Sequence, residues 1–190
     1  MKITELALPG ARLIEPRVFP DERGFFFESF KQSTYEAAGI REVFIQDNRS
    51  VSRKYVFRGL HFQRPPHAQA KIVSVSRGSA IDVIVDIRAG SPTFGKHLAV
   101  PLSMENRHRL FVPKGFAHGF VALEDDTEFD YKVSDEWHPE CESGVCWNDP
   151  ALDIDWKAIT GIDPSEFIVS PKDLVFPSLE SSSTLFTYEA

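Results

Sequence analysis

Short apolar segments recur along the chain, separated by clusters of turn-forming residues. Most alternate apolar and polar positions with the period of a half-buried strand, and they are rich in β-branched and aromatic side chains. Strands are expected over residues 12–19, 24–30, 55–62, 71–78, 80–87, 97–103, 109–115, 116–123 and 128–133. Clusters such as PDERG and LEDDTE between them indicate tight turns. The pattern predicts an antiparallel β-sandwich or barrel.

Helical signals are confined to two short stretches. In STYEAAGI, Ser33 and Glu36 have the spacing of a capping box, and Gly39 can close the helix at its carboxyl end. A second short helix is expected near DWKAIT. The last residues, 181–190, are polar enough to form a loosely held tail after the folded part of the chain.

The composition indicates one domain and excludes several partner classes. A chain of 190 residues with 42% hydrophobic positions supports one buried core, so residues 1–180 are expected to form a single domain. Acidic residues outnumber basic ones 28 to 21, and the basic residues are scattered, which argues against a nucleic-acid partner. With neither a signal-peptide pattern nor a membrane-length apolar run, we expect a cytoplasmic protein that does not bind membranes.

Several inward-facing strand positions are polar, where a core would be apolar. Because side chains alternate between the two faces of a strand, each polar residue can be assigned a face from its neighbours two positions away. The residues assigned to an apolar face in this way are Glu28, Lys71, His118 and Tyr131. Any one of them could be a satisfied core group or a lysine reaching the rim, but together they predict a ligand cavity.

His61 is a fifth candidate, and its face depends on strand regularity. It is in register with Tyr55 and Phe57, which assigns it to an apolar face. A bulge at Gly59 would shift that register.

A histidine, a lysine and a tyrosine in an aromatic pocket suit proton abstraction next to a carbonyl. Imidazole can remove the proton, an ammonium can stabilise the enolate oxygen, and a phenol can return a proton to the opposite face. Such an inversion needs no cofactor. Arg23 and Arg58 suit a phosphate group, although surface or interface salt bridges are an equal alternative.

The sequence does not favour metal chemistry. Cys141 and Cys146 lack a second ligand pair and are expected to be ordinary thiols. PKGFAH is similar to the second metal motif of cupins, but the first motif is replaced by His61, Phe62 and Gln63. Lys71 would also repel a divalent ion, so we expect no catalytic metal.

Specific motifs occur in a characteristic order between about residue 9 and residue 175. They include DERGFFFESF, QDNRS, VFRGLHFQ, AQAKIVSV, VPKGFAHGFVAL, EFDYKV, CESGVCWNDP and SPKD. This set resembles the dTDP-4-dehydrorhamnose 3,5-epimerase family. The resemblance implies a cupin-like jelly-roll barrel and a homodimer that exchanges N-terminal strands. It also implies cofactor-free inversion of C3 and C5 of dTDP-4-dehydro-6-deoxy-D-glucose, giving dTDP-4-dehydro-L-rhamnose.

The same resemblance assigns roles to residues. His61 would be the general base, Asp173 the carboxylate that orients it, Lys71 the group that holds the C4 oxyanion, and Tyr131 the acid. The implied substrate contacts are Arg23, Glu28, Gln46, Asp47, Asn48, Arg58, Lys71, His118, Trp137, Glu142 and Lys172. Arg23 and Glu28 would reach the partner's pocket across the dimer.

Trp137 departs from the family, which commonly has a tyrosine that stacks on thymine. An indole also stacks, so base binding is expected to survive, although discrimination between thymidine and uridine is open. Trp137 could instead pin a loop. Inversion at only one carbon, a non-catalytic nucleotide-sugar module and a metal-dependent cupin oxygenase are the alternatives to double epimerisation.

Overall fold

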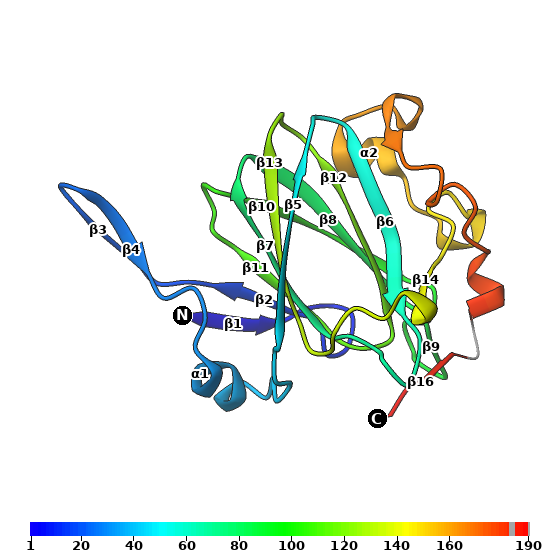
Figure 1. Cartoon of the computed structure of the whole chain (residues 1–190), viewed down its shortest axis with the longest axis horizontal. Helices are drawn as coiled ribbons and strands as arrows, with labels where there is room; N and C mark the ends of the chain where they lie inside the picture. The colour runs from blue at the N-terminus through cyan, green and yellow to red at the C-terminus, as the bar shows by residue number, and fades with distance from the viewer. Residues whose placement is uncertain (183–184, 190) are drawn as a thin grey trace.

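Two β-sheets face each other in the computed structural model, which describes residues 1–182 and 185–189 (Figure 1). The first sheet contains, in spatial order, β1 (Lys2–Glu5), β2 (Arg12–Glu15), β11 (Arg109–Val112), β7 (Lys71–Arg77), β13 (Thr127–Val133) and β5 (Gln46–Ser52). The second contains β10 (His97–Ser103), β8 (Ser79–Asp86), β12 (Phe116–Ala122), β6 (Val56–Gln63) and β14 (Glu142–Gly144), with β15 (Ile168–Val169) parallel to β6. The predicted antiparallel all-β architecture is confirmed.

The main core lies between the inner faces of the two sheets. Phe120 of β12 and Phe129 of β13 stack there with ring centroids 4.0 Å apart and planes 7° from parallel. Complete burial of such a side chain contributes about 1.5–3 kcal/mol. The aromatic contact therefore joins the two sheets within this core.

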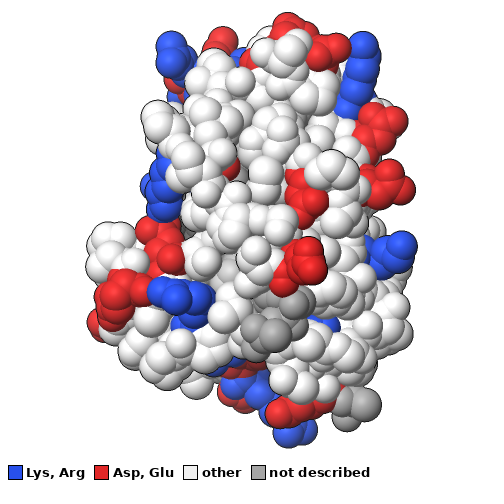
Figure 2. Space-filling model, turned by 90° about the vertical axis from the view of Figure 1, so that its right-hand side faces the viewer, with Lys and Arg blue, Asp and Glu red and all other residues white. Residues whose placement is uncertain are grey.

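A second core covers the outer face of the second sheet. It joins Phe57 and Leu60 of β6 to aromatic side chains of the C-terminal segment, including Trp147 and Trp156. The predicted second helix is found there as α2 (Trp156–Thr160), capped by Asp155 and closed by Gly161 at a φ of 74°. Short 3-10 helices complete the segment: Pro139–Cys141, Pro150–Leu152, Pro164–Glu166 and Leu179–Ser182. Acidic and basic side chains are interspersed over the surface on this side (Figure 2).

The described part of the expected tail is attached to this second core. β16 (Phe186–Thr187) pairs in parallel with β9 (Arg88–Ala89), and the Phe186 ring meets Phe62 edge-on at 5.7 Å. Residues 183, 184 and 190 of the predicted tail lie outside the described residues. Where it is described, the chain end is thus held by packing that its polar composition does not predict.

The first helix begins earlier than the capping pattern predicts. α1 (Gln32–Ala37) has Lys31 at its N-cap, and no side chain among the described residues caps it, so the predicted capping box is wrong. Gly39 follows the helix at a φ of 82°, as expected for its end. Packing of Tyr35 against the first sheet's outer face, within a buried cluster, places the helix in spite of its weak start.

The N-terminal hairpin extends away from both sheets (Figure 1). The predicted strand 12–19 is broken at Pro16, which lacks an N–H group, and the chain continues into β3 (Val18–Asp21) and β4 (Gly24–Phe27). Phe26 is 69% exposed and Glu28 is exposed as well. The prediction that Glu28 faces an apolar interior is therefore wrong for the single chain.

None of the helices in the described part of the chain has the length and apolar character needed to cross a membrane.

Candidate active site

An open cavity of about 240 Å³ lies between the sheets, beyond the stacked phenylalanines. Its walls come from β5, β7 and β13 on one side and from β6 and β12 on the other. The predicted site residues that line it are Asn48, Arg58, His61, Lys71, His118, Tyr131, Trp137 and Glu142. The period-two assignment of Lys71, His118 and Tyr131 to the interior is confirmed.

His61 reaches the cavity because β6 contains a bulge. His61 pairs with His118 while Arg58 pairs with Phe120, so β6 has one residue more than β12 between these two points. Phe57 consequently packs in the outer core, whereas Arg58 and His61 both line the cavity. The regular register that groups His61 with Tyr55 and Phe57 is wrong, and the bulge alternative is correct.

Asp173 orients His61 from behind. Its carboxylate is only 3% exposed, and Oδ1 lies 2.7 Å from His61 Nε2. Burial raises the pKa of Asp173, but the His61 imidazole and the Gly59 N–H more than offset this and hold that pKa below its ordinary value. The carboxylate therefore keeps the proton on Nε2, which leaves the Nδ1 lone pair of His61 available as a base.

Lys71 and Tyr131 enter the cavity from the sheet opposite His61. Burial lowers the pKa of Lys71 to about 8, and the charges of Asp82 and Glu142 limit this shift. Burial raises the pKa of Tyr131, so its phenol stays protonated; its hydroxyl lies 3.4 Å from Ser50 Oγ. The cavity thus holds an imidazole, an ammonium and a phenol, with His61 and Tyr131 on facing walls.

Asp82 is a site residue that the sequence interpretation missed. It is fully buried and accepts a 2.7 Å hydrogen bond from Nε2 of His118, which is 2% exposed. Burial lowers the pKa of His118, although the Asp82 charge opposes the shift. Asp82 shares a strand face with Ala80 and Ile84, so the alternation that assigned Lys71 inward could also have found it.

Trp137 stands at the rim, held by contacts with β5. Its backbone N–H donates to Gln46 Oε1 at 3.0 Å, and Gln46 Nε2 donates to Asn48 Oδ1 at 2.8 Å. The indole is 57% exposed. Gln46 thus supports the rim without lining the cavity, while Trp137 presents an open aromatic face.

Several charged side chains border the cavity near Asp173. Arg58 Nε donates to Ser52 Oγ at 3.1 Å, and Lys172 forms an ion pair with Glu142. Lys172 and Asp173 line a hollow that adjoins the cavity and shares Arg58, His61 and Glu142 with it. Two cationic side chains, Arg58 and Lys172, therefore lie on the same side of the cavity as His61.

Of the predicted contacts, Arg23, Glu28 and Asp47 lie away from the cavity, its rim and the adjoining hollow in the single chain. Arg23 sits at the hairpin tip, paired with Asp21 at 2.6 Å, and Glu28 follows β4. Asp47 points to the opposite face of β5 and pairs with Lys132 at 2.7 Å.

Glutamines extend the polar lining beyond the predicted set. Gln63 and Gln69 both line the cavity, and Gln63 Oε1 accepts from the His138 N–H at 2.7 Å. Once the bulge is allowed for, Gln63 shares the face of His61, which is the signal that could have found it.

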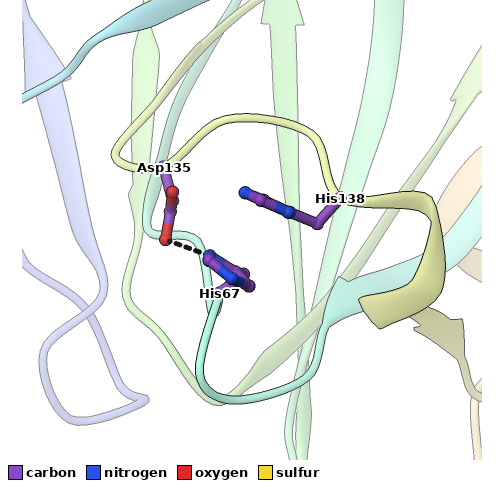
Figure 3. A group of neighbouring side chains, drawn as sticks. All are labelled: His67, Asp135 and His138. Atoms are coloured by element: carbon purple, nitrogen blue, oxygen red, sulfur yellow. Dashed lines mark hydrogen bonds and ion pairs between the residues drawn. The ribbon is translucent and has the colours of Figure 1, made fainter.

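One group of potential metal ligands lies beside the cavity. Among the described residues, the group whose ligand atoms lie close enough to share an ion is His67, Asp135 and His138 (Figure 3). Cys141 and Cys146 are free thiols, as predicted.

A β-sandwich cavity with an imidazole–carboxylate pair, an ammonium and an opposing phenol is the arrangement of a cupin-like acid–base epimerase. The model of the dTDP-4-dehydrorhamnose 3,5-epimerase family matches residues 5–181. The chain belongs to this family, and it is an isomerase; the resemblance seen in the sequence is confirmed.

Relatives and solved structures agree with this assignment over nearly the whole chain. The dTDP-4-dehydrorhamnose 3,5-epimerase of Escherichia coli K12 is 48% identical over 174 residues, which cover 91% of each protein. That of Pseudomonas aeruginosa is 52% identical over 157 residues, covering 82% of this chain and 86% of the relative. A crystal structure of the Legionella pneumophila dTDP-6-deoxy-D-glucose-3,5-epimerase in complex with dTDP-4-keto-L-rhamnose is 44% identical, has a TM-score of 0.92 and covers 100% of this chain and 99% of that one. The cupin-like jelly-roll fold is thereby confirmed.

Proposed function

We propose that this chain inverts C3 and C5 of dTDP-4-dehydro-6-deoxy-D-glucose and so forms dTDP-4-dehydro-L-rhamnose. The observation that carries the proposal is the placement of His61 and Tyr131 on facing sheets around one cavity that also contains Lys71. A base and an acid on opposite sides of a carbon invert it, because the proton leaves from one face and returns to the other.

Proton removal is the task of His61. Its Nδ1 takes a proton from the carbon next to the C4 carbonyl, and the resulting imidazolium is stabilised by the Asp173 carboxylate at 2.7 Å. The electrons move to O4, where the Lys71 ammonium stabilises the enolate oxygen. Electrostatic contacts of this kind contribute most where water is largely excluded, and Lys71 is largely buried.

Reprotonation is the task of Tyr131. Its phenol donates to the opposite face of the enolate carbon, the carbonyl re-forms, and solvent restores the protonation of both side chains. C3 and C5 both adjoin the same carbonyl, so one oxyanion site serves both carbons if the sugar ring turns between steps.

The remaining cavity residues suit the nucleotide and the sugar. Arg58 and Lys172 supply cations for the diphosphate, and the exposed Trp137 indole supplies a stacking face for thymine. Gln46 positions that rim through Trp137 and Asn48, and His118 and Glu142 are placed to contact the sugar. Asp47 is turned away from the cavity, so the geometry gives no support for its predicted contact.

The protein acts as a homodimer with exchanged N-terminal strands in this proposal. Phe19, Phe25 and Phe26 of the projecting hairpin are all more than two-fifths exposed, and β5 is the last strand of its sheet. A partner's hairpin packed near β5 would cover these rings and bring Arg23 and Glu28 toward the other cavity. We also place the protein in the cytoplasm, with residues 1–180 as one domain.

Solvent exchange tests the proposed reaction. Purified protein incubated with the substrate in deuterated buffer containing EDTA should introduce deuterium at both C3 and C5, as read by NMR and mass spectrometry. Exchange at one carbon only would show single epimerisation. Binding of the nucleotide sugar without exchange at either carbon would show a non-catalytic binding module, and exchange abolished by EDTA would show a metal-dependent reaction.

A further inference from the structure

Two imidazoles and a carboxylate converge just outside the cavity (Figure 3). His67 lies on the turn between β6 and β7, while Asp135 and His138 lie on the segment that follows β13. One ligand atom from each of the three residues lies within 4.8 Å of the others. The His67 and His138 rings stack with centroids 3.4 Å apart and planes 13° from parallel.

The spacing suits a tetrahedral ion. With ligand bonds of about 2.0–2.1 Å, neighbouring ligand atoms of a tetrahedral zinc site lie about 3.3 Å apart. His67 Nδ1 and Asp135 Oδ2 are hydrogen-bonded at 3.3 Å, and an ion bound between them would displace the shared proton without moving either atom far. Rotation of the His138 side chain out of its stack on His67 would bring its imidazole to the same spacing, and the group is only partly buried.

A further carboxylate supports His138. Glu140 Oε1 lies 3.1 Å from His138 Nδ1, so the carboxylate can accept the Nδ1 proton and leave Nε2 for an ion. Metal-bound histidines commonly have a carboxylate on the other ring nitrogen, which fixes the tautomer and the ring orientation. The arrangement thus contains the ligands of a metal site and one of its supporting contacts.

We propose that His67, Asp135 and His138 bind a divalent transition-metal ion, with Zn²⁺ as the ion best suited to two imidazoles and one carboxylate. Water completes the coordination. This site is separate from the cavity in which His61 and Lys71 face the substrate, and it has no part in the chemical step.

The ion would stiffen the segment that carries Trp137. That segment is already tied to the β6–β7 region, because Gln63 Nε2 donates to the carbonyl oxygens of His67 and Glu136 at 2.7 and 3.0 Å. Gln69 Nε2 also donates to the Asp135 carbonyl oxygen at 2.9 Å. A metal bridge across the same junction would restrict the motion of the segment that carries Trp137. The effect of this restriction on substrate binding rests on the proposed function.

Calorimetric titration with Zn²⁺ alone tests the site. After chelation and dialysis, the wild-type protein should bind one equivalent of Zn²⁺. His67→Gln and His138→Gln should each bind Zn²⁺ with an affinity at least about tenfold lower. His108→Gln, which changes a partly exposed histidine outside the group, is the matched control and should bind like the wild type. Zn²⁺ should also raise the Tm of the wild type and the control but not of the two variants. Equal affinity in all four proteins, or no binding by the wild type, would overturn the site.

Steady-state kinetics separates the site from the proposed function. Zn²⁺ should lower KM for the dTDP-sugar about two- to fivefold, because a segment that is already ordered loses less conformational entropy when the substrate binds, and kcat should be unchanged. A KM that does not respond to saturating Zn²⁺ would overturn the link to Trp137. Absence of any turnover would contradict the proposed reaction and leave the calorimetric result standing, because no substrate enters that experiment.

Discussion

Lys71 has the environment that most directly sets the pH range of the reaction. Its pKa is about 8 in the folded chain, because burial disfavours the charged form. In the proposed reaction the Lys71 ammonium holds the oxyanion, so kcat/KM should fall about tenfold per pH unit above pH 8. In Lys71→Arg, whose guanidinium stays charged, the remaining activity should lack this alkaline limb. A wild-type profile that is flat to pH 10 would contradict the assigned role.

The buried Lys71 ammonium should also lower the stability of the folded chain at neutral pH. An unfolded lysine has a pKa of about 10.4, so between pH 8 and that value the unfolded chain binds more protons and stability rises with pH. Lys71→Met should therefore raise the free energy of unfolding at pH 7 by about 1–3 kcal/mol, measured by denaturant titration. The exposed Lys96→Met is the control and should change it by less than about 0.5 kcal/mol. A Lys71→Met variant less stable than wild type would refute the stated cost.

Residue positions were predictable where strands are regular. Lys71, His118 and Tyr131 face the interior as their neighbours two positions away indicate, and Asp82 follows the same rule. His61 does not, because one extra residue in β6 reverses its face. The pairing of His61 with Asp173 joins residues 112 apart in the sequence, so periodicity alone cannot show it.

At the scale of elements, close contact between β6 and β12 positions the His61 wall. A Cβ added at Gly119 would lie 2.6 Å from the Arg58 carbonyl oxygen and 2.9 Å from Gly59 Cα. Gly119→Ala should force the strands apart, lower kcat by at least about tenfold and reduce the free energy of unfolding by about 1–3 kcal/mol. Wild-type kcat and stability in this variant would show that the strand contact does not position the site.

The longest strand that the hydrophobic pattern missed is β5 (Gln46–Ser52). Its sequence QDNRSVS is polar on both faces, because Asn48 and Ser50 line the cavity while Asp47 and Arg49 pair with β13 on the other side. A strand with one wet face and one ion-paired face lacks the alternation that identifies strands. Its polarity is thus a consequence of its role in the site.

At the scale of the whole molecule, the hairpin must act in trans if the dimer is as proposed. Arg23→Ala and His61→Asn should each be nearly inactive, yet subunits refolded together should regain about a quarter of wild-type activity, since half of the dimers would contain one intact site. Refolding each variant alone is the control. Recovery no greater than the sum of the separate variants would place Arg23 in the same chain's site or outside any site.

The pattern of apolar and polar residues predicts least about how distant segments and separate chains pack together. No period in the sequence predicts the exposure of Phe19, Phe25 and Phe26 in the hairpin, and in the proposed dimer the partner chain would cover these rings. The contacts of the described chain end are also not predicted by the pattern. Phe186 pairs with β9 and packs against Phe62, which precede it by about a hundred residues. Long-range contacts of this kind are fixed by topology, not by local composition.

Exchange measured separately from inversion tests the central claim most directly. In deuterated buffer, Tyr131→Phe should exchange the protons at C3 and C5 while the product keeps the substrate configuration, because His61 removes and returns them on one face. His61→Asn should lose exchange and inversion together, by about 10²–10⁴-fold. Wild-type inversion by Tyr131→Phe, or undiminished exchange by His61→Asn, would contradict catalysis by a base and an acid on facing walls.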